Sequence, residues 1–274
     1  MRGTGTALFL LPTDTMGGAE NVLRLTADAA LRSGRYARVR VFVLSGSETG
    51  TLDRLREAGA EVVHTGANSE SRGLPALLRM LRRERYALVF SSHTHLNAAA
   101  SAARAANWLR TERLVAREST MMLERDLGRV RPLVTSLYRL YGAQDRIVCQ
   151  TERMASSLTR HTRGRFAART AFVPNPLGGA VRAHNASSSF RIAWCGRLAC
   201  VKSPERALEA LAKLRADGHE ASLVMIGDGP LRTALEERSE ERQVRRRSRR
   251  ECPRGHRRSP WKRRGARRSR ASPV

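Results

Sequence analysis

A stretch in the last third of the sequence places two basic side chains around a turn between a strand and a helix. In "CGRLACVKSPERALEAL", Arg197 and Lys202 lie on either side of that turn. Ser203 is a good N-cap residue, and Pro204 suits the first helical turn. Two cations beside the N-terminus of a helix form an anion site, most naturally for a diphosphate. The alternative is that both charges are solvated on a loop.

Glycines follow several of the predicted strands. Gly17 and Gly18 lie in "TDTMGGAEN", between the first strand and the first helix, where a bare backbone can approach an anion. The spacing is not GxGxxG, which argues against a nicotinamide enzyme, and a tight turn alone is the alternative. Two further loops near the basic pair also carry glycines after predicted strands. Gly196 ends one strand run, and Gly227, Asp228 and Gly229 of "GDGPL" come at the end of the next.

Two histidines follow the fourth predicted strand in "SSHTHLN". In an extended segment, His93 and His95 would share a face, because they lie two residues apart. Two imidazoles without a nearby carboxylate do not make a metal site, so we expect hydrogen bonds to a polar ligand, with Asn97 close by. A pair of loop histidines without function is the alternative.

The cysteines and the apolar runs limit the classes of protein to which this sequence can belong. No CxxC pair and no His/Cys metal spacing occurs, so we expect no metal and no other cofactor. The thiols fit a reducing cytoplasm. The apolar run "ALFLLP" is too short for a signal peptide or a membrane span. We therefore expect a cytoplasmic protein that touches a membrane, if at all, only at its surface.

Short apolar runs that alternate with amphipathic segments must position these residues. The runs typical of buried strands cover residues 6–11, 38–44, 60–65, 87–92, 113–117, 146–150, 170–174, 190–196 and 221–227. The segments with helical spacing cover residues 19–32, 51–58, 75–85, 97–107, 132–141, 152–160, 204–217 and 231–241. Such alternation predicts parallel sheets with helices on both faces.

The alternation is interrupted once, which predicts two domains. Residues 1–174 form the first domain, and the Pro-, Gly- and Ser-rich residues 175–189 form a linker. Residues 190–241 open a second βα series that stops after two units. The predicted fold class is α/β with two Rossmann-like, doubly wound domains, of which the second is incomplete, followed by a disordered basic tail at residues 242–274.

Several of these pieces together resemble retaining glycosyltransferases of family 4, which have the two-Rossmann-domain GT-B architecture. The matching pieces, in the family's order, are "GGAE", "HTHLN", "DRIVCQTERMASSL", "VPNP", "GRLACVKSPERALEA" and "VMIGDGPLRTALE". The resemblance implies a hexosyltransferase of polysaccharide biosynthesis that moves a sugar from a nucleotide-sugar donor to a glycan or lipid-linked acceptor, with retention. It also implies that the first domain binds the acceptor and the second binds the donor.

The resemblance also implies roles for single residues. Gly17 and Gly18 would approach the donor phosphates, and His95 would contact the transferring sugar near the reaction centre. Arg197 and Lys202 would hold the diphosphate and stabilise the leaving group without a metal, which is sound because the leaving group gains charge in the transition state. Further contacts to the sugar or the nucleotide are expected from Asn97, Gly196, Gly227, Asp228 and Gly229.

The sequence departs from the family after Glu241, where further βα units and a Glu-x7-Glu segment are expected. Residues 242–274 instead carry 15 of the 51 basic residues and a single acid, Glu251. This tail is interpreted as an out-of-frame continuation. The alternatives are a disordered extension or a basic arm that binds nucleic acid with strong salt dependence.

The interpretation of residues 242–274 affects the expected activity and the expected partners. A chain truncated in its donor domain is expected to be inactive alone. Nucleic acid is not the expected partner, because about half of the +26 net charge belongs to the tail. A non-catalytic binding protein, or a nucleic-acid binder acting through the tail, is the alternative function. A sugar-nucleotide epimerase of related fold has no specific support in the sequence.

Overall fold

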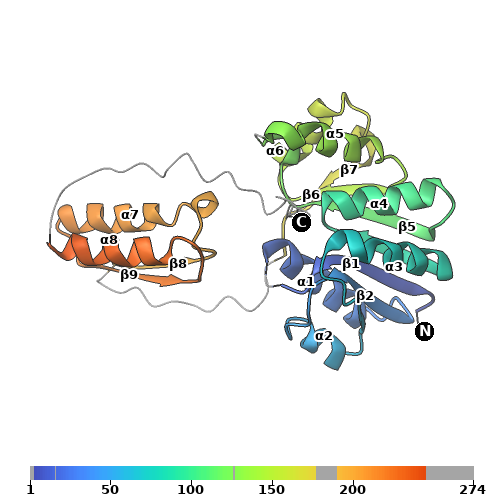
Figure 1. Ribbon diagram of the computed structural model, residues 1–274, viewed down its shortest axis with the longest axis horizontal. Coiled ribbons are helices and arrows are strands. Elements are labelled where there is room, and N and C mark those ends of the chain that lie inside the picture. The colour runs from blue at the N-terminus through green and yellow to red at the C-terminus, as the bar shows by residue number, and fades with distance from the viewer. Residues whose placement is uncertain (1–2, 16, 126, 177–189, 245–274) are drawn as a thin grey trace, which may run out of the picture. The chain divides into compact units, whose positions relative to one another are not determined.

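The computed structural model describes residues 3–15, 17–125, 127–176 and 190–244. The chain divides into two compact units, Met1–Ala180 and Val181–Val274, which are described separately below. The division falls inside the stretch predicted as a linker. Most of that stretch, from 177 to 189, and most of the predicted tail, from 245 to 274, lie outside the described residues (Figure 1).

Unit 1 is built on a sheet of seven parallel strands. Its strands are β1 (Thr6–Thr13), β2 (Arg38–Ser45), β3 (Glu61–His64), β4 (Arg85–Ser91), β5 (Arg110–Glu118), β6 (Arg146–Cys149) and β7 (Thr170–Phe172). They lie in the order β3-β2-β1-β4-β5-β6-β7, and every neighbouring pair is parallel. The predicted Rossmann-like sheet is therefore confirmed for this unit.

Helices cover both faces of this sheet. They are α1 (Gly18–Arg32), α2 (Asp53–Glu57), α3 (Glu70–Arg83), α4 (Thr94–Ala105), α5 (Arg131–Arg139) and α6 (Glu152–His161), with short 3-10 turns η1 (Met122–Glu124), η2 (Gly128–Val130) and η3 (Ala167–Arg169). One buried cluster joins α1 and α2 to the sheet, and a second joins α3 and α4 to it. Helices α5 and α6 lie near β6 and β7 (Figure 1).

The central strand β1 explains why the apolar runs are continuous. Leu8 and Leu10 belong to the cluster under α3 and α4, whereas Phe9 and Leu11 belong to the cluster under α1 and α2. Successive side chains of a strand point to opposite faces, so a strand covered on both sides must be apolar at every position. All four side chains are 0–1% exposed.

Helix α3 begins five residues earlier than the sequence suggested. Pro75 was predicted as its first residue, but it lies inside the helix, which begins at Glu70. Gly73 accounts for a feature that the helical spacing did not reveal. A Cβ atom there would lie 1.9 Å from the Leu44 carbonyl oxygen, so only glycine allows α3 to approach β2 this closely.

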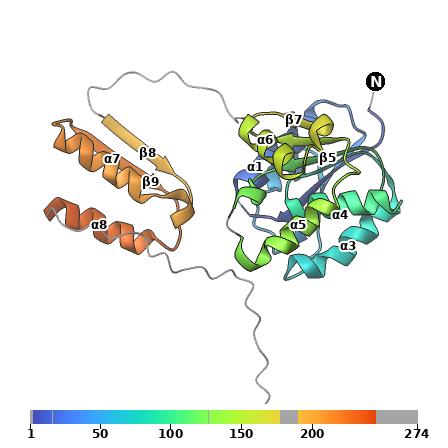
Figure 2. The ribbon, with the colours of Figure 1, turned by 90° about the horizontal axis from the view of Figure 1, so that it is seen from above.

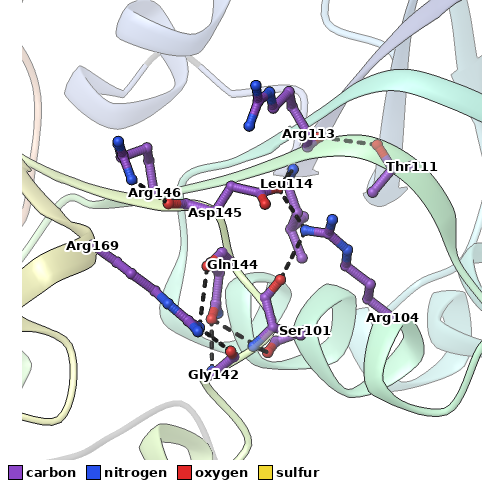
Figure 3. A network of polar contacts seen from close by, with 11 residues as sticks. Ser101, Arg104, Thr111, Arg113, Leu114, Gly142, Gln144, Asp145, Arg146 and Arg169 are labelled. Carbon is purple, nitrogen blue, oxygen red and sulfur yellow. Dashed lines mark hydrogen bonds and ion pairs between the residues drawn. The ribbon is translucent and has the colours of Figure 1, made fainter.

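A polar network fixes the C-terminal end of α4 to the loop before β6 (Figure 3). Arg104 donates to the Asp145 carboxylate at 2.6 Å, and the Leu114 backbone N–H donates to the same carboxylate at 2.7 Å. Ser101 lies beside Gln144, and their side-chain oxygens are 3.3 Å apart. The network ties α4 to β5 and to the loop before β6, at the end of α4 opposite the two histidines.

Unit 2 contains one short parallel sheet. Its elements are β8 (Phe190–Cys195), η4 (Cys200–Lys202), α7 (Glu205–Ala216), β9 (Ala221–Ile226) and α8 (Arg232–Val244). Helices α7 and α8 both lie on one side of the sheet (Figure 2). Helix α8 ends at Val244, so the first three residues of the predicted tail are helical and the predicted boundary at Glu241 is wrong. Within residues 190–244 the sheet has two strands.

Candidate functional site

The strand order of unit 1 marks one place where loops diverge. Strands β1 and β4 are neighbours in the sheet, yet β2 and β3 lie on one side of them and β5, β6 and β7 on the other. At such a switch point the loops after the two strands leave to opposite faces and open a crevice for a ligand. The loop after β1 ends at Gly17, Gly18 begins α1, and the loop after β4 carries His93.

Gly17 makes room for a carboxylate at the start of α1. A Cβ atom on Gly17 would lie 2.1 Å from Oε2 of Glu20, whereas a Cβ on Gly18 would meet nothing within 4 Å. Gly17 has an extended backbone with φ of −122°, which any residue can adopt. Space for the Glu20 side chain therefore explains Gly17 better than a turn that demands glycine.

The first histidine, His93, pairs with Glu20. Its Nε2 atom lies 3.3 Å from Glu20 Oε1, and both side chains are about four-fifths buried. Burial raises the pKa of Glu20. The hydrogen bonds from His93 and from the backbone N–H of Glu20 lower it, as do the charges of His93 and Arg117. Together they outweigh burial, so the pKa lies below its usual value. The pair links the two loops that flank the switch point.

The second histidine, His95, has a carboxylate partner from α3. Its Nε2 atom lies 3.2 Å from Glu70 Oε2, and its ring centroid lies 6.0 Å from that of His93. Burial lowers the pKa of His95, and His93 lowers it further, against the opposing charge of Glu70. A His95 side chain that is neutral near pH 7 is suited to hydrogen bonds with hydroxyl groups.

Two expectations about these histidines are wrong. They do not lie on an extended segment, because His93 is the N-cap of α4 and His95 is in its first turn. They do have nearby carboxylates, which α1 and α3 supply from other parts of the sequence. Even so, the described residues contain no group of three or more His, Cys, Asp or Glu side chains that could hold a metal ion.

Asn97 lies beneath this edge and not on it. Its side chain is 1% exposed, and it donates to the Arg117 carbonyl at 3.0 Å and to Glu118 Oε1 at 3.2 Å. The Ser91 hydroxyl donates to the side-chain oxygen Oδ1 of Asn97 at 2.6 Å. A direct contact to sugar or nucleotide was predicted for Asn97. That prediction is wrong, because a buried amide with these partners is not available to a ligand.

Glu118, which the sequence analysis missed, is the centre of this buried network. Tyr138 and Tyr141 donate to its two carboxylate oxygens at 2.8 Å and 2.6 Å. Burial raises the pKa of Glu118, although the hydrogen bonds from Tyr141, Tyr138 and Asn97 and the charge of Arg117 oppose it. The network holds the start of α4, and so the two histidines, against β5 and α5. A charged pair that closes the apolar run "RLVARE" was the available signal.

Arg117 connects the loops after three strands. Its guanidinium donates to Ser92 after β4 at 2.7 Å, to Gln150 after β6 at 3.0 Å and to Asn175 after β7 at 2.7 Å. Arg117 is 3% exposed, and burial lowers its pKa, against the charges of Glu118 and Glu20. One buried cation thus fixes the carboxyl edge of β4, β6 and β7.

A third histidine lies near a carboxylate at the same edge of the sheet. Nε2 of His64, at the end of β3, lies 3.9 Å from Oδ2 of Asp14, and both side chains are more than nine-tenths buried. The Thr49 backbone N–H donates to the same Asp14 oxygen at 2.9 Å. This pair was not predicted, although Asp14 closely follows the predicted strand run 6–11 and His64 lies near the end of the run 60–65.

Arg197 and Lys202 lie on the surface of unit 2, in the segment between β8 and α7. Both side chains are exposed, and among the described residues neither has an ion-pair partner. Ser203 is not the N-cap of α7 as predicted. It has a left-handed backbone with φ of 45°, and Pro204 takes the N-cap position. Both cations follow the carboxyl end of β8, and within the described part of the chain they have no ion-pair partner.

Glycines hold the loops after β8 and β9 together. A Cβ on Gly227 would lie 1.8 Å from the Gly196 carbonyl oxygen, and a Cβ on Gly229 would lie 2.4 Å from the Leu198 carbonyl oxygen. The Leu198 N–H donates to the Asp228 carbonyl at 2.9 Å. These glycines bring the two loops into contact, which places Arg197 and Asp228 at one edge, as predicted.

Comparison with known proteins identifies the family. Residues 17–176, more than half of the chain, match the glycosyl transferase 4-like domain. The chain belongs to this glycosyltransferase family. The match begins at Gly17 and includes Glu20, His93, His95 and Glu118, so both histidines and the carboxylates Glu20 and Glu118 lie within the matched domain.

A curated relative shows a short stretch of similarity. The GDP-mannose-dependent alpha-(1-6)-phosphatidylinositol dimannoside mannosyltransferase of Mycobacterium tuberculosis is 39% identical over 69 residues, which is 25% of this chain and 18% of that protein. The chain thus covers less than a fifth of that relative's length.

Solved structures of glycosyltransferases share the fold. Anabaena Alr3699/HepE in complex with UDP is 14% identical and gives a TM-score of 0.61, over 87% of this chain and 65% of that one. The lipopolysaccharide outer core galactosyltransferase WaaB is also 14% identical, with a TM-score of 0.58 and the same coverage. The fold is therefore of the GT-B type, and the chain spans about two-thirds of the length of these structures.

Within residues 3–176 and 190–244, leaving aside Met16 and Asp126, no helix is both long and apolar enough to cross a membrane.

Proposed function

We propose that this protein transfers a sugar from a nucleoside diphosphate donor to a hydroxyl group of a glycan or lipid-linked acceptor, with retention of anomeric configuration. One observation carries the proposal. The residues that match the glycosyltransferase domain include two histidine–carboxylate pairs at the switch point of the sheet, where a ligand is expected.

In this proposal unit 1 handles the sugar and the acceptor. His95, neutral near pH 7 and 37% exposed, hydrogen-bonds to the transferring sugar. Gly18 has open space beside its Cα atom and is the backbone position where a donor phosphate can approach α1. Glu20 already lies against Gly17, so an anion there must displace a resident carboxylate.

Unit 2 would bind the donor diphosphate. Arg197 and Lys202 are exposed, lack an acidic partner among the described residues, and flank a loop that glycines hold in place. Two such cations stabilise the charge that develops on the leaving nucleoside diphosphate, so the transfer needs no metal. Gly196, Gly227, Asp228 and Gly229 would then shape the surface around the nucleotide.

The class of donor is supported by the relatives. The mycobacterial relative is named as GDP-mannose-dependent, and the Anabaena structure holds UDP. We therefore propose a UDP- or GDP-sugar as the donor. The mycobacterial relative is named as a phosphatidylinositol dimannoside mannosyltransferase, which supports a lipid-linked acceptor and contact with a membrane surface. We propose that this contact is made from the cytoplasm.

The direct test is a transfer assay with the purified chain. UDP- and GDP-sugars carrying a radiolabel are incubated with glycan and lipid acceptors, and the anomeric configuration of any product is read by NMR. The sequence alone predicted no activity for residues 1–274. Because unit 2 does form a buried cluster, though of only three residues in the part that the structure describes, we expect transfer that is slow but measurable.

Variants make the assay specific. His95→Ala should lower the transfer rate by about one to three orders of magnitude, the cost of losing one stabilising donor. Arg72→Ala replaces an exposed residue of α3 and serves as the control. A product of inverted configuration would contradict the retaining mechanism, and equal rates for the His95 variant and the wild type would contradict its role.

A further inference from the structure

Helix α5 carries apolar side chains on two of its sides. On the inner side Val134 and Tyr138 are buried in the cluster with α6 and β6. On the outer side Leu133 is 66% exposed, and Val130 and Leu140, at the two ends of the helix, are each 49% exposed. A helix that only covers a sheet needs one apolar side, so the outer side requires another explanation.

The outer apolar residues form one continuous stripe. Val130, Leu133, Leu137 and Leu140 have the spacing i, i+3, i+7 and i+10, which places them on one side of a helix. Val130 and Leu140 have helical backbone angles although they flank the helix. Leu137 is half-buried and joins the outer stripe to the core of unit 1. We call these four residues the outer stripe.

Arginines surround the outer stripe. Arg125, Arg129, Arg131 and Arg139 are exposed, and among the described residues none of them has an ion-pair partner. The neighbouring acid Glu124 pairs with Arg153 of α6 at 3.5 Å. In its described part, this surface therefore combines exposed leucine and valine side chains with arginines that have no ion-pair partner there.

We propose that the outer stripe and these arginines dock unit 1 onto a membrane that contains anionic phospholipids. Apolar side chains at this spacing enter the boundary between headgroups and acyl chains, and arginines pair with lipid phosphates. A second copy of the chain is a poor occupant, because it would bring like charges together. A nucleic acid would leave the apolar side chains in water.

The inference deepens the proposed contact with lipid-linked acceptors and rests on that part of the proposed function. Docking would bring a lipid-linked acceptor to the glycosyltransferase domain without a membrane-spanning helix. Binding to vesicles is measured without donor or acceptor, so a failure of docking leaves the transfer reaction untouched.

The test is flotation of the full chain with vesicles. Phosphatidylcholine vesicles are compared with vesicles that also contain phosphatidylglycerol, at about 0.1 M and about 0.5 M salt, since high salt screens the other basic residues of the chain. The variant V130S/L133S/L140S should lower the partition coefficient at least about tenfold at both salt concentrations. R129Q/R131Q/R139Q should lower it about fivefold per arginine at low salt, on the anionic vesicles only.

The control variants make substitutions of the same chemical kind on helix α3, at fewer positions. Leu74→Ser replaces an exposed leucine of α3, and R72Q/R79Q replaces exposed arginines of the same helix. Circular dichroism confirms that every variant is folded. Wild-type binding no stronger than that of the outer-stripe variant, at both salt concentrations, would overturn the proposal. So would sedimentation data showing a dimer that this variant dissociates.

Discussion

The two units present opposite kinds of chemistry at the carboxyl edges of their sheets. In unit 1 His93 and His95 each face a carboxylate, and a buried arginine and glutamate support the loops from below. In unit 2 two exposed cations have no acidic partner among the described residues. An edge whose charges are already balanced suits a neutral, hydroxyl-rich ligand, whereas an edge with unpaired cations suits an anion.

The two units also differ in how completely their sheets are covered. The seven-stranded sheet of unit 1 is covered by helices on both faces. In unit 2 the alternate residues Val224 and Ile226 are 49% and 57% exposed, so one face of the two-stranded sheet is bare in the described part. Rigid positioning of side chains is therefore expected in unit 1, and a lower free energy of unfolding in unit 2.

The largest expected effect comes from breaking the core of unit 1. Leu10→Ala should lower the free energy of unfolding of unit 1 by about 2–5 kcal/mol, because a fully buried leucine leaves a cavity that rigid neighbours cannot fill. Leu208→Ala in unit 2 should cost about 2 kcal/mol or less, since a sparse core relaxes more easily. Urea unfolding is followed by fluorescence in backgrounds that keep a single tryptophan, Trp108 for unit 1 or Trp194 for unit 2.

Leu74→Ala, at an exposed leucine of α3, is the control for these variants and should cost much less than Leu10→Ala. A loss in unit 2 that equals the loss in unit 1 would contradict the contrast between the cores.

The fold could be predicted well because its signals are local. Seven runs of apolar residues in unit 1 and two in unit 2 became parallel strands, since a strand buried on both faces leaves a continuous apolar run. The helix ends were less predictable. Pro75 suggested a start, but Gly73 allows α3 to begin earlier against β2, and that close approach depends on tertiary contacts.

The candidate site could be predicted only as a set of loops. The positions of His93, His95, Arg197 and Lys202 followed from the ends of predicted strands. Their partners did not, because Glu20 and Glu70 belong to other helices, and nothing local in the sequence links them to the histidines. Asn97 looked like a ligand contact for the same reason, since only the fold reveals that Glu118 and Arg117 bury it.

A smaller effect should come from the buried carboxylate. Glu118→Gln should lower the free energy of unfolding of unit 1 by about 1–3 kcal/mol at pH 7, because an amide cannot accept from all three donors around it. The matched control is Glu112→Gln, at an exposed position on the same strand. Equal stability of the two variants would show that the network contributes nothing.

The two buried glutamates of unit 1 should respond to pH with opposite sign. The raised pKa of Glu118 gives a contribution that is greatest below its unfolded value and declines as pH rises toward the folded pKa. The lowered pKa of Glu20 gives a contribution that is present above its unfolded value and is lost as pH falls through the folded pKa.

Urea unfolding between about pH 4 and 8 checks both signs. The difference between wild type and Glu20→Gln should grow with pH, whereas Glu118→Gln should remove a decline of stability with pH. The same slope in both variants would contradict the assignment.

The smallest effect concerns the titration of one histidine. Burial should place the His95 midpoint below 6.5, and Glu70→Gln should lower it further, because the Glu70 carboxylate favours the charged imidazole. NMR titration of the imidazole signals measures both midpoints, with Glu57→Gln, at an exposed position, as control. A midpoint above 6.5 would mean that His95 is not the neutral, sheltered group described here.

We propose that Arg197 and Lys202 of unit 2 receive the diphosphate of the donor, and calorimetric titration of the full chain with UDP and GDP tests this central claim most directly. R197A/K202A should weaken binding of the preferred nucleotide by about tenfold or more, because each charged hydrogen bond contributes about 1.5–3 kcal/mol. R206A/K213A removes the same charges from exposed positions of α7 and should change the affinity by less than about twofold. Equal affinities for the two double variants, or no binding of either nucleotide by the wild type, would contradict the claim.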